Sequence, residues 1–234
     1  MFELTMSGKA RPYKVLCIGA HSDDIEIGCG GTILKLLSEG HVAEIDWIVL
    51  SADRQRKNEA RESAGCFLSE AEKKTVVVKN FKGSFFPSYA EKIKEYFEQL
   101  RDRSSPDVIF THYRHDLHQD HRVVSDLTWN TFRNHLILEY EIPKYDGDLG
   151  APNCYVHLDQ STTALKIKHL LNCFETQRSK PWFADDTFLS ILRLRGVECN
   201  APQRYAEAFY CRKMLLGTEK VLRNEVQNAD KNNR

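Results

Sequence analysis

The most restrictive feature of this sequence is a short apolar segment that ends abruptly in a polar cluster, and it occurs twice. The first segment, Tyr13–Gly19 (YKVLCIG), runs directly into AHSDD. The second, residues 107–111 (DVIFT), runs into HYRHDLHQDHR. Short apolar runs of this kind are typical of strands that are buried on both faces. We therefore expect both polar clusters to lie at strand ends.

Further strands and helices are predicted to alternate along the first half of the chain. Strands are expected at 43–51 and 75–78, and helices at 33–38, 54–68, 88–101 and 120–133. Strands that alternate with helices indicate βαβ units and a parallel sheet with helices on both faces. The predicted fold class is therefore α/β, a single-domain, Rossmann-like three-layer sandwich with a mostly parallel sheet.

The second half of the chain has a less regular pattern. Strands are predicted at 136–142 and 153–158 and a helix at 162–174, while 190–195 and 207–212 are expected to complete the sheet or to add a small flanking layer. No linker divides the chain, so one domain is expected over residues 1–219. The polar tail, residues 220–234, is expected to be disordered.

Charge and cysteine content exclude several classes of protein. Lys plus Arg and Asp plus Glu both count 33, so no net positive charge favours nucleic acid. No signal peptide is evident, and no apolar run approaches the roughly 20 residues of a membrane span. The seven cysteines are scattered and form no CxxC pair. These features predict a reduced, cytoplasmic protein that acts on a small molecule, and they leave homo-oligomers open.

Both polar clusters offer metal ligands beside other titratable groups. The first is His21-Ser22-Asp23-Asp24 and the second is His118-Gln119-Asp120-His121. In open parallel sheets, ligands bind beyond the carboxyl ends of the strands, where these clusters are expected. A hydrolytic zinc site needs about three protein ligands, commonly histidines and a carboxylate, and an open position for water.

The economical division of roles places His21, Asp24 and His121 on the metal. Asp23 is then the base that takes a proton from the metal-bound water, and His118 stabilises the oxyanion or protonates the leaving amine. From the residues alone, Asp23 and Asp24 could exchange roles, as could His118 and His121. Zn²⁺ is the expected cofactor, and Fe²⁺ is the alternative, since two histidines and one carboxylate also hold iron in non-haem oxygenases.

Several segments resemble one known family. AHSDDIEIGCGGT looks like the AHPDD…GGT signature of the PIG-L/LmbE-like de-N-acetylases, and THYRHDLHQDHR resembles that family's second motif, a strand ending in TH followed by DxHxDH. RKNEA is similar to the family's RxxEA helix. The pair RG followed by YAEAF is similar to the end of many bacterial members. The resemblance spans roughly residues 13–215.

The resemblance implies a zinc-dependent deacetylase in which the matching residues have fixed roles. The ligands would be His21, Asp24 and His121, the general base Asp23, and the group that supports the oxyanion His118. The substrates implied are N-acetylglucosamine-type amino sugars on lipid, thiol-precursor, nucleotide or antibiotic scaffolds.

The motifs also predict roles for four other residues. Arg56 matches the family's arginine and is expected to bind a substrate hydroxyl or phosphate. Asp116 is assigned to the substrate site, with bracing of a histidine as its alternative. Asp120, next to His121, is expected to support the ligands. Ser22 replaces the usual proline, so a looser turn is expected there.

Two alternatives concern the glycine-rich stretch and the function itself. Residues 28–32 (GCGGT) lack the GxGxxG spacing and the Walker lysine, so they are expected to allow close packing beneath the metal and not to hold a phosphate. His112 is expected to have a structural role. A non-catalytic sugar- or nucleotide-binding module of the same fold is the alternative function.

Overall fold

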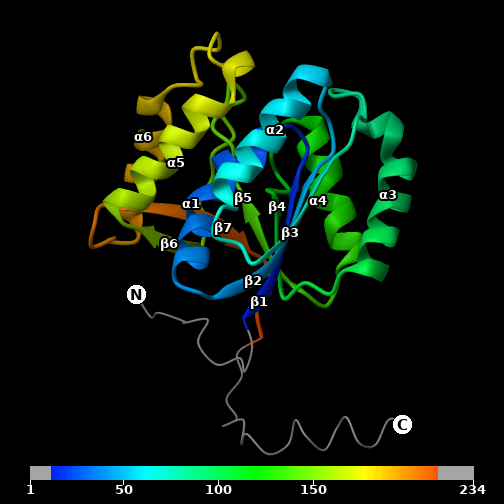
Figure 1. The fold of residues 1–234 in the computed structure, drawn as a ribbon, viewed down its shortest axis with the longest axis horizontal. Coiled ribbons are helices and arrows are strands. Elements are labelled where there is room, and N and C mark those ends of the chain that lie inside the picture. Colours follow the sequence, from blue (N-terminus) through cyan, green and yellow to red (C-terminus); the bar gives the residue numbers. More distant parts are fainter. Residues whose placement is uncertain (1–11, 216–234) are drawn as a thin grey trace, which may run out of the picture.

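The computed structural model describes residues 12–215, which form one seven-stranded sheet between helical layers (Figure 1). The strands are β1 (Tyr13–Gly19), β2 (Val42–Val49), β3 (Lys73–Val78), β4 (Val108–His112), β5 (Leu136–Tyr140), β6 (Cys154–Leu158) and β7 (Tyr205–Cys211). The helices are α1 (Asp24–Ser38), α2 (Arg54–Phe67), α3 (Phe86–Arg103), α4 (Gln119–Thr131), α5 (Gln160–Cys173), the 3₁₀ turn η1 (Glu175–Gln177) and α6 (Asp185–Glu198). The predicted end of the domain at residue 219 and the predicted tail both lie outside the described residues.

The strand order in the sheet is β3-β2-β1-β4-β5-β7-β6. The first five strands in this order, β3 to β5, are parallel to one another. Strand β7 runs antiparallel to both β5 and β6. The predicted α/β fold with a mostly parallel sheet is confirmed.

Alternate side chains of β1 supply the two faces of the core. Val15 and Cys17 pack in a cluster with residues of α1, α2, α5 and α6. Leu16 and Ile18 pack in a second cluster with residues of α3 and α4. Helices α1, α2, α5 and α6 therefore cover one face of the sheet, and α3 and α4 cover the other. Figure 1 shows the sheet between these two layers. Within residues 12–215, no helix is long and apolar enough to cross a bilayer.

The centre of the sheet is the point where the order of the strands reverses. β1 pairs with β2 on one side and with β4 on the other. The connections that leave the carboxyl ends of β1 and β4 therefore turn to opposite sides, and a crevice opens between them. His21 follows β1 and His118 follows β4, so this topology brings the two polar clusters together.

The glycine-rich stretch differs from its expected form, because residues 28–32 lie inside α1 and not before a helix that begins at residue 33. Local propensity disfavours glycine in a helix by about 1 kcal/mol. Tertiary packing overrides that preference here. A Cβ atom on Gly28 would lie 2.2 Å from Tyr140 Cδ2, and one on Gly31 would lie 2.6 Å from Leu158 Cδ1. The glycines do allow close packing, as expected, but they do so inside α1, where they let the helix approach the strands of the sheet.

Of the two expectations for residues 190–195, completion of the sheet is wrong, because these residues belong to α6, which lies in the helical layer beside the sheet. The segment is too short for its periodicity to separate a strand from a helix. The buried residues Phe188, Leu192 and Arg195 follow the three- and four-residue spacing of one helical face. Residues 207–212, in contrast, fall on β7.

Candidate active site

Three side chains from the two clusters bring their donor atoms together in the crevice. His21 follows β1, Asp24 is the first residue of α1, and His121 lies in the first turn of α4. His121 Nε2 lies 3.2 Å from His21 Nδ1 and 3.6 Å from Asp24 Oδ1. His21 Nδ1 lies 3.3 Å from Asp24 Oδ2. We refer to these three residues as the donor set.

The spacing of the donor set fits a metal ion. Donors about 2.0–2.1 Å from a tetrahedral zinc are about 3.3–3.4 Å apart, close to the distances between the two ring nitrogens and the carboxylate oxygens of Asp24. Two imidazole nitrogens and one carboxylate leave the fourth position open. The residues present therefore fit a hydrolytic zinc or a related divalent ion.

Each histidine of the donor set has a carboxylate on its other ring nitrogen. Asp116 Oδ2 lies 2.9 Å from His121 Nδ1, and Asp120 Oδ2 lies 3.2 Å from His21 Nε2. Such a carboxylate holds the proton on the outer nitrogen and leaves the inner lone pair for a metal. Asp116 and Asp120 are buried, and neither lines the cavity. Of the two roles considered for Asp116, this position favours bracing of His121.

The charges around the donor set favour a cation there. Burial alone would lower the pKa of His21, but Asp24 and Asp120 outweigh burial and raise the pKa to about 10. Burial lowers the pKa of His121 to about 3, and His112 acts in the same direction. The field of the carboxylates thus stabilises one positive charge, while His121 stays neutral with a lone pair to offer.

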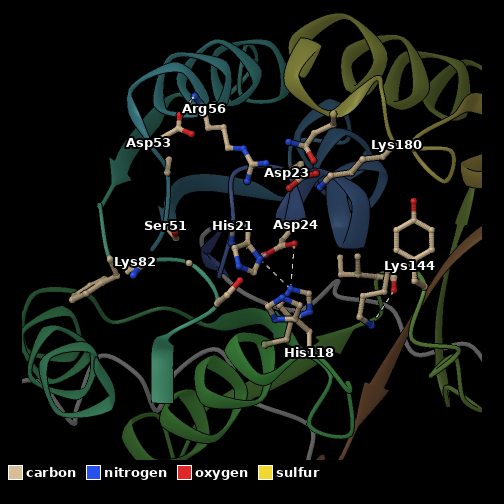
Figure 2. A pocket seen from close by; sticks show the side chains of 18 of the residues that line it. His21, Asp23, Asp24, Ser51, Asp53, Arg56, Lys82, His118, Lys144 and Lys180 are labelled. Atoms are coloured by element: carbon tan, nitrogen blue, oxygen red, sulfur yellow. Dashed lines mark hydrogen bonds and ion pairs between the residues drawn. The ribbon is translucent and has the colours of Figure 1, made fainter. Parts of the chain in front are cut away.

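Asp23 lies beside the donor set without belonging to it. It is the N-cap residue of α1, yet its side chain makes no capping hydrogen bond. Its side chain points into the cavity in Figure 2. Burial, followed by the neighbouring charge of Asp24, raises the pKa of Asp23 to about 6. A carboxylate with a raised pKa is suited to accepting a proton near neutral pH.

A hydrogen bond from the backbone determines which ring nitrogen of His118 carries the proton. His118 is the N-cap of α4, and its Nδ1 accepts the N–H of Asp120 at 3.2 Å. In a neutral imidazole the proton must then be on Nε2. Burial, followed by the charge of His21, lowers the pKa of His118. His118 lines the cavity (Figure 2), so it can present a neutral N–H donor to a bound ligand.

His112 and Ser22 are both buried at the base of the site. His112 Nε2 accepts the N–H of Ala20 at 2.9 Å and lies 3.2 Å from Asp24 Oδ2, so that nitrogen is already engaged. The turn that contains Ser22 is closed by a 2.6 Å hydrogen bond from His21 N–H to Asp24 Oδ2. His112 therefore lies beside the donor set, and a structural role for it stays a prediction. Two further groups of side chains also have metal-ligand spacing among the described residues: Asp24, His112 and His121, and His21, His118 and His121.

A cavity of about 800 Å³ opens over the donor set. Arg56, in the first turn of α2, lies on its wall, where Figure 2 shows its side chain directed toward His21 and Asp23. Other lining residues come from the second half of the chain, and no motif marked them in the sequence. They are Ile142, Lys144, Tyr145, Asp146, Gln177, Lys180 and Trp182.

Comparison with known proteins adds a family and a set of related folds. A family model described as GlcNAc-PI de-N-acetylase (PIG-L) matches residues 16–132, half of the chain. That range includes both polar clusters and Arg56.

Solved structures with the same fold include proteins that are named for two different reactions, a deacetylase and a hydratase. A conserved protein from Thermus thermophilus is 20% identical, with a TM-score of 0.67, over 88% of this chain and 97% of that one. An N,N'-diacetylchitobiose deacetylase from Pyrococcus horikoshii is 25% identical, with a TM-score of 0.61, over 84% and 82%. The 4-carboxy-2-hydroxymuconate hydratase from Pseudomonas putida is 14% identical, with a TM-score of 0.67, over 89% and 99%. The fold alone therefore does not determine the reaction.

Proposed function

The chain belongs to the GlcNAc-PI de-N-acetylase (PIG-L) family, and from that premise we propose that it is a metal-dependent hydrolase that removes the N-acetyl group from an N-acetylglucosamine-type amino sugar or its conjugate. Family membership supports an amide hydrolase. The amino sugar and the metal are proposals about this chain.

One observation carries the proposal. A donor set with metal-ligand spacing shares a cavity with two side chains that it leaves free, Asp23 and His118. Amide hydrolysis needs a base for the attacking water and a donor for the developing oxyanion. A site that only binds a sugar needs neither group.

In this proposal, His21, Asp24 and His121 hold the metal, with Zn²⁺ as the expected ion. When bound, such an ion supplies Lewis acidity, which polarises the acyl oxygen and lowers the pKa of water. Asp116 and Asp120 hold the two histidines in the required tautomers.

The remaining residues move protons and position the substrate. Asp23 accepts a proton from water as the water oxygen forms a bond to the acyl carbon. His118 Nε2–H donates a hydrogen bond to the acyl oxygen as negative charge develops there. When the carbon–nitrogen bond breaks, Asp23 returns the proton to the amine, and acetate and an amino sugar leave. Arg56 binds a polar group of the substrate at the cavity wall.

The Asp23→Asn variant tests the assignment of the base. It should bind about one metal ion per chain, like the wild type, and lose about 10²–10⁴-fold in kcat, the usual contribution of general acid–base catalysis. Amine release from a panel of N-acetylated amino sugars and conjugates measures the activity. Asp126→Asn is the matched control, because Asp126 is exposed on α4 and does not line the cavity. Full activity in Asp23→Asn would exclude Asp23 as the base.

Metal analysis of the same protein separates the alternatives. Chelation should abolish amine release, and Zn²⁺ should restore it. Iron at one ion per chain with oxygen-dependent turnover would instead support the non-haem iron alternative. Metal binding without cleavage of any N-acyl sugar would support a non-catalytic binding module.

A further inference from the structure

Two cationic side chains, Arg56 and Lys180, line the cavity from different elements. Arg56 lies in the first turn of α2, and Lys180 lies in the loop between η1 and α6. Figure 2 shows the two side chains extending toward each other, with Asp23 between them. Both are partly buried.

Among the described residues, neither the guanidinium group of Arg56 nor the ammonium group of Lys180 forms an ion pair with a carboxylate. Two other lysines line the cavity, Lys144 and Lys82. The ammonium group of Lys144 lies 3.0 Å from Asp116 and 2.5 Å from Asp148, and that of Lys82 lies over the ring of Phe85, 4.0 Å from its centre. Asp53, near Arg56, uses Oδ1 to accept the backbone N–H of Arg56 at 2.9 Å. The acidic side chain that lies between the two cations in Figure 2 is Asp23, which the proposed reaction requires as a base.

Unpaired, partly desolvated cations that face one cavity are a recognition site for an anion. A guanidinium group binds phosphate or carboxylate oxygens through two parallel hydrogen bonds, and a nearby ammonium group adds a point charge. The cavity, at about 800 Å³, is in the upper part of the range for sites that enclose whole ligands. Trp182 lines the same wall, and its ring lies 5.3 Å from Lys180 Nζ.

We propose that the N-acyl amino sugar carries an anionic group, phosphoryl or carboxylate, which Arg56 and Lys180 bind together. This inference rests on the proposed function and narrows its substrate class. It predicts that a neutral amino sugar is a poor substrate, because the two charges then have no partner.

The test compares three substrates with the same N-acetyl group. They are methyl N-acetylglucosaminide, N-acetylglucosamine 1-phosphate and N-acetylmuramic acid, which are neutral, phosphorylated and carboxylated. The wild type should show kcat/KM at least about tenfold higher for one of the anions than for the neutral sugar, the size expected of one charge-assisted hydrogen bond. The anion that is preferred shows whether the bound group of the substrate is a phosphoryl group or a carboxylate. The preference should weaken as salt is raised.

The Lys180→Gln variant assigns the effect to this site. It should lose about tenfold in kcat/KM on the preferred anion and less than about twofold on the neutral sugar. Lys92→Gln is the control, because Lys92 is exposed on α3 and does not line the cavity. Equal kcat/KM on all three substrates, or an anion preference unchanged in Lys180→Gln, would overturn the inference.

A binding measurement keeps the inference testable if no sugar is hydrolysed, which would count against the proposed function alone. Calorimetry on metal-free protein would compare glucosamine 1-phosphate and muramic acid with methyl glucosaminide. An anion should bind at least about tenfold more tightly, and Lys180→Gln should remove that difference. Equal binding of all three would overturn the inference.

Discussion

At the scale of single residues, the histidines of the donor set are held by two carboxylates, each of which has several other hydrogen-bond or ion-pair partners. Asp120 is buried and accepts the backbone N–H groups of Ser84 and Phe86 at 2.5 and 3.0 Å, as well as contacting His21. Asp116 accepts the N–H of His118 at 2.7 Å and also contacts His121 and Lys144. Because each carboxylate has several partners, the imidazoles cannot rotate freely. The ligand geometry is therefore set before a metal arrives.

The Asp116→Asn variant should weaken metal binding by about 10–100-fold, since the amide is a weaker acceptor for His121 Nδ1–H. Competition with a chromophoric chelator measures the affinity, and Asp126→Asn again serves as the control. Wild-type affinity combined with a raised KM would show instead that Asp116 acts on the substrate. This variant therefore decides between the two roles that were considered for Asp116.

At the scale of elements, the position of Asp23 and Asp24 depends on how closely α1 approaches the sheet. The helix begins at Asp24, and Gly28 one turn later lies against the ring of Tyr140. Tyr140 in turn donates a hydrogen bond from its hydroxyl to Ile18 O at 2.8 Å, on β1. A larger residue at position 28 would push the start of α1, and both aspartates, away from β1.

Two glycine-to-alanine changes should therefore have opposite effects on the free energy of unfolding. Gly28→Ala should lower it by about 1–3 kcal/mol, because the new methyl group overpacks against Tyr140. Gly65→Ala should raise it by about 0.5–1 kcal/mol, because Gly65 is exposed inside α2 and a Cβ there meets nothing within 4 Å. Urea unfolding of both variants measures the difference. A stabilised Gly28→Ala protein would contradict this account of the packing of α1.

The same helix shows what sequence patterns could and could not predict about the elements. The buried strand β1 and the polar residues after it were predictable, because a continuous apolar run ends sharply at Gly19. The inclusion of residues 28–32 in α1 was not, because the gain comes from contacts with Tyr140 and Leu158, over 100 residues away in the chain. Local propensity contains no information about such contacts.

At the scale of the whole molecule, the donor set was predictable and the cavity above it was not. The ligands follow parallel strands, so the topology alone brings them together. Lys180 and Trp182 follow η1 in the irregular half, where β7 inserts antiparallel between β5 and β6. No periodicity places such residues, because their position depends on how α5 and α6 pack on α1 and β7.

A buried ion pair joins this second half to the metal-binding half. Lys166 Nζ, on α5, lies 2.5 Å from Glu207 Oε1, on β7, and both side chains are 2% exposed. The same carboxylate accepts the N–H groups of Gly31 and Thr32 in α1, at 2.8 and 2.6 Å. Lys166 also donates to Ile27 O at 2.6 Å. One charge pair thus connects α1, which carries Asp24, to two elements of the second half.

Removing only the lysine should be costly, because it leaves the carboxylate of Glu207 buried without its cation. We expect Lys166→Met to lower the free energy of unfolding by about 3–5 kcal/mol, measured by urea denaturation. Lys168→Met, an exposed change on the same helix, should stay within about 0.5 kcal/mol of wild type. Adding Glu207→Gln to Lys166→Met should recover part of the loss, since the amide oxygen can still accept one of the two α1 N–H groups and no charge is left buried. If the double variant is no more stable than Lys166→Met alone, the loss comes from packing of α5 and not from the unpaired carboxylate.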